Sequence, residues 1–106
     1  MEKSEIKLVV FNGEDFPYWK TRTKVYLQSK GRAIWNIVQN PYKIPEDLTT
    51  LDGADAAAEA TRYENNSKAV NILFAALCRS EYDRLSHLET AHAIWNKLCT
   101  YHEGTT

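Results

Sequence analysis

The chain has 106 residues, with 13 basic and 14 acidic side chains and a formal net charge of −1. This length supports one hydrophobic core, and a content of 43% hydrophobic and 11% aromatic residues is typical of a folded domain. The balanced charge argues against direct nucleic-acid binding, which needs a concentrated basic surface. We therefore expect no nucleic-acid partner for this chain.

The opening residues and the cysteines indicate an intracellular protein. The segment Met1–Glu5 is charged, and the apolar run Leu8–Phe11 is too short for a signal peptide or a membrane span. Cys78 and Cys99 lack the spacing of a metal site and are expected to be small core residues in a reducing compartment, with a disulfide left open. The predicted location is the cytoplasm, without membrane attachment.

Residues 1–15 are predicted to form an N-terminal arm and turn. Apolar residues alternate from position 6, and Asn12-Gly13 then favours a turn. A single strand cannot satisfy its own backbone hydrogen bonds. The arm therefore either folds back over the helices or offers an exposed edge or groove lid to a partner, with Leu8, Val10 and Phe11 as candidate contacts.

Residues 16–106 are predicted to form one helical lobe. The first helix begins after Asp15, a candidate cap, with Pro17 in its first turn, and it ends at Gly31. A shorter helix is expected from Arg32 to Gln39, where Pro41 stops it. The entrance and outer face of the first helix carry further candidate contacts: Tyr18, Lys20, Thr21, Lys24 and Gln28.

Three more helices are expected after a turn-rich loop. The longest is expected to run from Ala56 to Cys78 with Asp55 as its cap, and a short one should span Ser80–His87. Thr90 should cap the last helix, which runs to about Tyr101. The predicted fold is therefore all-α, a compact bundle of about five helices with an extended N-terminal arm.

Apolar residues at helical spacing predict the core. In the longest helix the inward side should include Ala60 and Tyr63, with Glu59 and Glu64 on the solvated side. The tryptophans are expected in the core rather than in a ligand groove. The residues predicted to determine the fold are Phe16, Trp19, Leu27, Trp35, Val38, Leu73, Leu77, Trp95, Leu98 and Tyr101.

No arrangement of side chains predicts catalysis. The three histidines and two cysteines lack the spacing of a zinc site, and no residues pair as nucleophile and base. A Gly-rich phosphate loop is also missing from a chain with four glycines. We therefore predict a non-enzyme without catalytic residues, metal or cofactor.

Two groups of residues form a family pattern over residues 8–106. The first group is Phe11-x-Gly13, Phe16-x-x-Trp19, Leu27, Trp35 and Val38. The second is Asn66-x-x-Ala69, Thr90-Ala91, Trp95, Leu98, Tyr101 and Glu103-Gly104. Together they resemble the start of the Gag polyprotein of copia-type long-terminal-repeat retrotransposons.

The resemblance implies the N-terminal lobe of a capsid-like region. Such a lobe would self-associate into a shell around the element's RNA, and RNA binding would belong to a zinc knuckle that lies outside this chain. The alternative is a host gene derived from Gag and kept as an adaptor for a peptide or protein partner. The outer face of the first helix suits the first function, and the arm suits the second.

Overall fold

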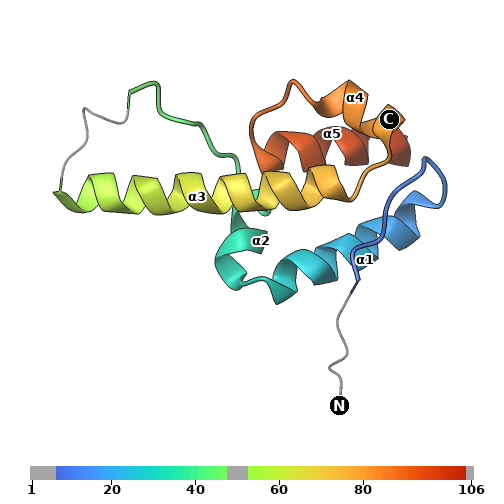
Figure 1. Ribbon diagram of the computed structural model, residues 1–106, viewed down its shortest axis with the longest axis horizontal. Helices are drawn as coiled ribbons and strands as arrows, with labels where there is room; N and C mark the ends of the chain where they lie inside the picture. Colours follow the sequence, from blue (N-terminus) through green and yellow to red (C-terminus); the bar gives the residue numbers. More distant parts are fainter. Residues whose placement is uncertain (1–6, 48–52, 105–106) are drawn as a thin grey trace, which may run out of the picture.

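The computed structural model describes residues 7–47 and 53–104, and this part of the chain is all-α (Figure 1). Parts of the expected arm and loop, at 1–6 and 48–52, lie outside it, as do residues 105–106. Its five helices are α1 (Phe16–Ser29), α2 (Arg32–Gln39), α3 (Gly53–Ala75), α4 (Arg79–Leu85) and α5 (Ala91–Glu103). Helix α2 packs against α1, α3 and α5, and α3 also packs against α5.

The first two helices follow their sequence signals closely. Helix α2 has the predicted bounds, and Gly31 before it has φ 132°, a backbone conformation that favours glycine. Helix α1 carries proline in its first turn as predicted. The prediction that Asp15 caps α1 is wrong, because its backbone is left-handed at φ 56° and its side chain makes no capping hydrogen bond.

The later helices differ from prediction mainly at their ends. Helix α3 begins at Gly53 and places Asp55 inside its first turn, so Asp55 is not the cap. Helix α4 begins one residue before the predicted start, with Cys78 at the N-cap. The predicted cap of α5 is confirmed, since the Thr90 side chain accepts a hydrogen bond from the backbone N–H of Ala93.

The arm folds back onto the end of α3. The Phe11 N–H donates to the carbonyl of Ala76 at 2.8 Å, and the Cys78 N–H donates to the carbonyl of Phe11 at 3.0 Å. These bonds form an isolated parallel bridge between Phe11 and Leu77. Of the two arrangements that the sequence left open, the structure shows the docked one around Phe11.

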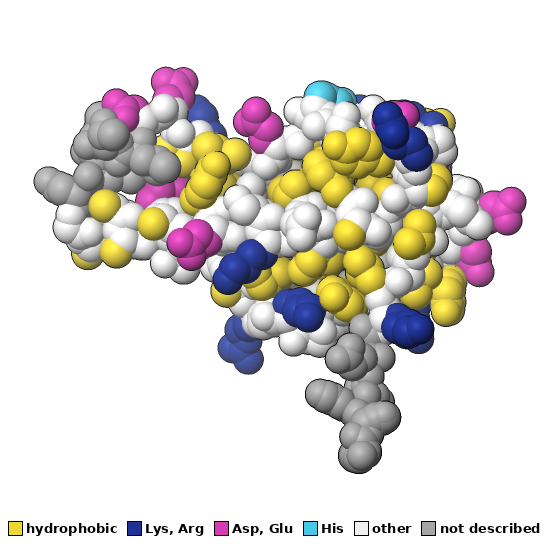
Figure 2. All heavy atoms as spheres, viewed as in Figure 1, with side chains coloured by type: hydrophobic (Ala, Val, Ile, Leu, Met, Phe, Trp, Pro, Cys, Tyr) yellow, Lys and Arg dark blue, Asp and Glu magenta, His cyan; other side chains and the backbone are white. Residues whose placement is uncertain are grey.

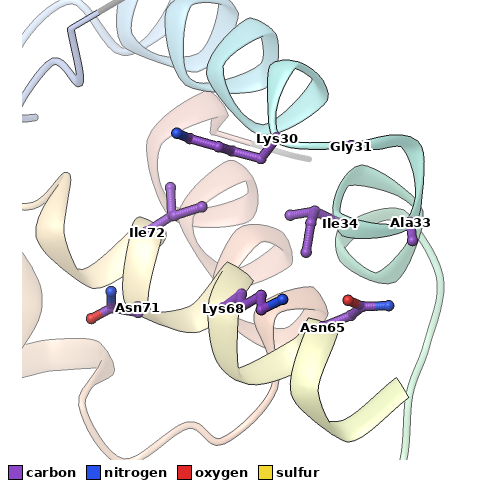
Figure 3. Close-up of a pocket in the computed structure, with 8 residues that line it drawn as sticks. All are labelled: Lys30, Gly31, Ala33, Ile34, Asn65, Lys68, Asn71 and Ile72. Atoms are coloured by element: carbon purple, nitrogen blue, oxygen red, sulfur yellow. The ribbon is translucent and has the colours of Figure 1, made fainter. Parts of the chain in front are cut away.

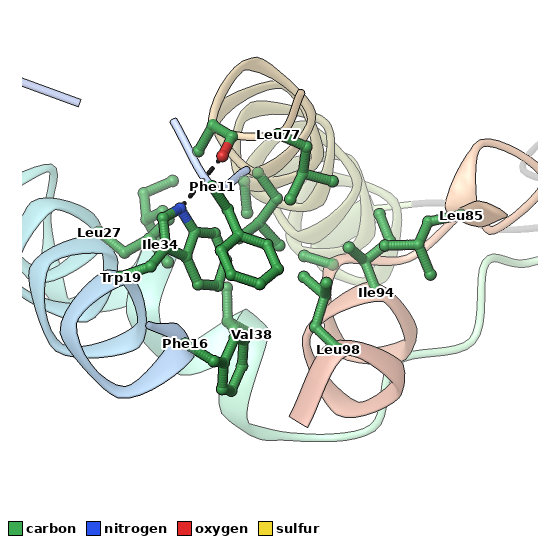
Figure 4. Close-up of a cluster of buried hydrophobic side chains, with 14 residues drawn as sticks. Phe11, Phe16, Trp19, Leu27, Ile34, Val38, Leu77, Leu85, Ile94 and Leu98 are labelled. Carbon is green, nitrogen blue, oxygen red and sulfur yellow. Dashed lines mark hydrogen bonds between the residues drawn. The ribbon is translucent and has the colours of Figure 1, made fainter. Parts of the chain in front are cut away.

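The core lies where the arm and the helices converge (Figure 4). Seven predicted core residues are buried, and two, Trp35 and Trp95, pack half-buried against them. The seven are Phe16, Trp19, Leu27, Val38, Leu73, Leu77 and Leu98.

Of the residues predicted to determine the fold, Tyr101 is the one that the structure places outside, with 61% of its surface exposed. The inward position at this end of α5 belongs to His102, whose ring centroid lies 4.7 Å from that of Phe11 and 5.3 Å from that of Phe16. Ala60 and Tyr63, which were predicted on the inward side of the longest helix, are, like Tyr101, exposed. Within the described residues, no helix combines the length and apolar character needed to cross a membrane.

Candidate interaction surface

The outer face of α1 consists of Thr21, Lys24, Val25 and Gln28, all exposed. Their spacing puts them on one side of the helix, opposite the buried stripe that includes Trp19 and Leu27. This surface therefore contains three of the contacts predicted from the sequence, and it adds Val25, which is 45% exposed.

Lys20, a fourth predicted contact on α1, lies at the side of this face and is tied to α5. Its Nζ atom is 2.6 Å from Oε2 of Glu103. This hydrogen bond is the main reason that the pKa of Lys20 is raised. Lys20 therefore joins two helices of the same chain, whereas Lys24 forms no salt bridge within the described residues.

The segment Phe16–Gln39, which spans α1 and α2, is basic throughout. It contains five basic residues and no acidic residue: Lys20, Arg22, Lys24, Lys30 and Arg32. The total charge did not reveal this group of basic residues, because acidic residues elsewhere in the chain nearly cancel their charge. Figure 2 shows dark blue side chains on the side of the molecule where α1 and α2 lie.

Two of these cations rest on aromatic rings instead of pairing with carboxylates. The Nζ atom of Lys24 lies 5.9 Å from the ring centroid of Trp35, and that of Lys30 lies 5.0 Å from that of Tyr26. Across residues 7–47 and 53–104, neither lysine forms a salt bridge. Their charge is therefore not neutralised within the described part of the chain.

A hollow of about 460 Å³ lies between the α1–α2 turn and α3 (Figure 3). Lys30 borders it from the α1 side and Lys68 from α3, while Ile34 and Ile72 extend into the space between the helices. We call this feature the basic hollow, and its lining also includes Gly31, Ala33, Asn65 and Asn71. A lining that combines two lysines with two isoleucines suits an anionic side chain with an aliphatic stem.

The arm presents fewer contacts than the sequence predicted. Phe11 is only 1% exposed, so the prediction that its side chain contacts a partner is wrong. Leu8 is half-buried and packs against the core. Val10 and Tyr18 remain more than half exposed and border a smaller hollow of about 260 Å³.

A cluster of polar side chains around the buried carboxylate of Glu81 joins α4 to α5. The carboxylate of Glu81 is 2.9 Å from Nε2 of His102 and 2.6 Å from Nη2 of Arg84. Sequence reasoning missed this cluster because the partners come from two helices that only the fold brings together. Within the described residues, no group of three His, Cys, Asp or Glu side chains is arranged to hold a metal ion.

The two cysteines are free thiols and each is half-buried. Cys99 packs against the core as predicted, whereas Cys78 lies at the N-cap of α4. The hydrogen bond between Cys78 and Ser80 lowers the pKa of the Cys78 thiol. Burial raises the pKa of the Cys99 thiol.

The residues of the sequence pattern also meet in space. Asn66 on α3 is buried, and its side chain accepts from the Ala91 N–H at 2.8 Å and donates to the Glu89 carbonyl at 3.0 Å. Thr90, between these two residues, caps α5. The Asn66 and Thr90-Ala91 parts of the pattern therefore act together to fix the start of α5 on α3.

The family described as gag-polypeptide of LTR copia-type matches residues 23–106, which include the whole Asn66 and Thr90-Ala91 arrangement. The chain belongs to this family. No curated protein and no solved structure matches it. The resemblance drawn from the sequence is thus confirmed over most of its length, and within this copia-type Gag chain the shared pattern coincides with the residues that hold the helices together.

Proposed function

We propose that this chain is a protein-association domain of a copia-type Gag polypeptide, and that copies of it assemble into a capsid shell. The observation that supports this is the outer face of α1, where Lys24 has no carboxylate partner in the described part of the chain and Val25 is 45% exposed. A solvated apolar residue beside unpaired cations provides area and charge for contact with another protein.

Shell assembly requires contacts that are weak and repeated. A small, mostly polar face such as that of α1 suits this requirement, because small polar interfaces form and dissociate readily. A contact between two different faces of neighbouring copies can also continue from copy to copy. We place this assembly inside the cell, where the free thiols of Cys78 and Cys99 remain reduced.

The test is the substitution Lys24→Glu, followed by sedimentation velocity over a range of protein concentrations. The wild-type chain should form larger species as concentration rises, and Lys24→Glu should shift this rise to concentrations about tenfold higher or more. The exposed Lys97 on α5 provides the control, since Lys97→Glu changes net charge equally at another site. Equal effects of the two variants would show that net charge, rather than the outer face of α1, controls association.

The exposed pair Val10 and Tyr18 favours a second candidate, a host adaptor that binds a peptide or protein partner. Such a protein would remain a monomer or dimer and form a defined complex through the smaller hollow. Deleting the arm is a poor test, because it removes the buried Phe11 from the core. Val10→Ser and Tyr18→Ser leave that residue in place, and the adaptor function is rejected if neither weakens partner binding.

A further inference from the structure

We propose that the basic hollow of one copy receives the acidic end of α3 from a second copy. The acidic end is the described chain at 41–47 and 53–64, and its exposed carboxylates are Glu46, Asp47, Asp55 and Glu64. This proposal rests on the association proposed above and names the two surfaces that meet.

The acidic end has the composition and the position of a docking element. Its two described segments contain five acidic residues, Glu46, Asp47, Asp55, Glu59 and Glu64, against the basic pair Lys43 and Arg62. Figure 1 shows that this half of α3 extends beyond the other helices, and Figure 2 shows magenta side chains around it. At about 1.5 Å per residue, the helical segment 53–64 extends roughly 18 Å, enough to reach a neighbouring copy.

The lining of the basic hollow complements these carboxylates. Lys30 and Lys68 are exposed and form no salt bridge within the described residues, so both can pair with incoming carboxylates. The side-chain amides of Asn65 and Asn71 have no hydrogen-bond partner in the described part of the chain and can donate as well. Ile34 and Ile72 provide apolar contact for the aliphatic part of a Glu side chain.

A second copy fits these observations better than a nucleic acid. The chain as a whole has a formal charge of −1, and the projecting acidic end would repel a phosphate backbone. The two surfaces adjoin on α3, where Glu64 lies one turn before Lys68, but Glu46 and Asp55 lie farther along the projecting end. The proposed contact therefore joins that projecting end of one copy to the basic hollow of another, and these are unlike faces. Contacts of this kind continue from copy to copy and produce rings or open arrays.

The decisive experiment compares two charge-reversed proteins alone and mixed, by sedimentation velocity. One carries Lys30→Glu with Lys68→Glu, and the other carries Glu46→Lys with Asp55→Lys. Each alone should associate at least about tenfold more weakly than wild type, because like charges then meet. The mixture should regain association, because each protein supplies the surface that complements the reversed surface of the other.

The substituted residues are all exposed, and circular dichroism will confirm that both proteins keep their helices. Arg79→Glu on α4, outside both surfaces, is the matched control and should leave association unchanged. The pairing of these surfaces is overturned if wild type associates and each charge-reversed protein associates equally well. It is also overturned if mixing the two proteins does not restore association. In both cases the proposed association itself stands. If wild type remains monomeric up to its solubility limit, both proposals fail.

The remaining measurement tests binding of a single-stranded RNA oligonucleotide by fluorescence anisotropy. RNA could bind wild type in a salt-sensitive way and fail to bind the protein with Lys30→Glu and Lys68→Glu, while self-association stays the same in both. That result would assign the hollow to phosphate binding and overturn the inference. We expect no RNA binding to wild type at physiological salt.

Discussion

The indole N–H of Trp19 donates a hydrogen bond to the backbone carbonyl of Ala76, 57 positions later in the chain, at 3.1 Å. The same N–H lies 3.0 Å from the carbonyl oxygen of Val9. One buried side chain on α1 therefore connects to both the arm and the end of α3, where Phe11 also forms its bridge.

Replacing Trp19 with Phe should both destabilise the fold and loosen the arm. The substitution removes the shared donor and leaves space in the core, so we expect the free energy of unfolding to fall by about 2–4 kcal/mol. Urea denaturation measures the loss, and hydrogen exchange at the Phe11 and Cys78 amides should accelerate. The control is Trp35→Phe, which changes a half-buried residue and should lower the free energy of unfolding by less. Unchanged exchange at Phe11 would show that Trp19 does not hold the arm.

Replacing Asn66 with Ala should destabilise the junction between α3 and α5. The change leaves the Ala91 N–H and the Glu89 carbonyl without their partner, at an expected cost of about 2–4 kcal/mol. The adjacent Asn65 is half-buried and makes no comparable bonds in the described chain, so Asn65→Ala should change stability by less than about 0.5 kcal/mol. Thermal unfolding of the two variants decides the matter, and similar losses would contradict the role of Asn66.

Replacing Thr23 with Val should stabilise the protein. Thr23 is 1% exposed, and its hydroxyl oxygen has no hydrogen-bond partner within the described part of the chain. Because Val has nearly the same shape without the buried hydroxyl, we expect a gain of about 1 kcal/mol. Thr21→Val is the matched control on the exposed side of the same helix and should not stabilise. A loss at position 23 would mean that the hydroxyl is satisfied in solution.

Tyr42 should titrate at unusually high pH. Burial and then a 2.7 Å hydrogen bond to Glu59 raise its pKa to about 12. Because the folded pKa lies above the unfolded value of about 10, its contribution to stability is complete below pH 10 and is lost as the pH rises towards 12. The stability difference between wild type and Tyr42→Phe should therefore shrink over this range.

Absorbance titration of the phenolate provides a direct check on Tyr42. The difference between wild type and Tyr42→Phe should show one phenol that ionises at about pH 12. Tyr63→Phe is the control and should retain that component. If this component disappears from Tyr63→Phe instead, the phenol that ionises at high pH is not that of Tyr42.

The helix boundaries that the sequence predicted well are those with strong local signals. Gly31 and Pro41 bracket α2, and Thr90 with Gly104 bracket α5, because these residues act on the backbone beside them. The start of α3 was placed late because Asp55 suits a first turn as well as a cap.

The side chains that were misplaced are those whose burial depends on partners from elsewhere in the fold. Hydrophobicity put Tyr63 inside α3 and Glu59 outside, yet Tyr63 is 41% exposed and Glu59 is buried. Glu59 is stable there because Tyr42 and Arg62 both donate to it. Helical spacing allowed either Tyr101 or His102 to follow Leu98 inward, and the hydrogen bond between His102 and Glu81 favours His102.

The interaction surfaces were predictable in part. Periodicity alone placed Thr21, Lys24 and Gln28 on the outer face of α1. The basic hollow depends on Lys68, which lines the same hollow as Lys30 only because α3 packs beside the α1–α2 turn. A total charge near zero also concealed the separation of basic and acidic segments. The positions of the charged residues along the chain would have revealed it.

The bridge between Phe11 and the end of α3 has a consequence for synthesis on the ribosome. The partners of Phe11, Ala76 and Cys78, are translated only after α1, α2 and the whole of α3. Until then Phe11 and Trp19 lack the surface that buries them, so the nascent chain carries exposed aromatic side chains through most of its translation. Closure of the arm is therefore a late, long-range step, and chaperones that recognise aromatic segments have their longest opportunity to bind before it occurs.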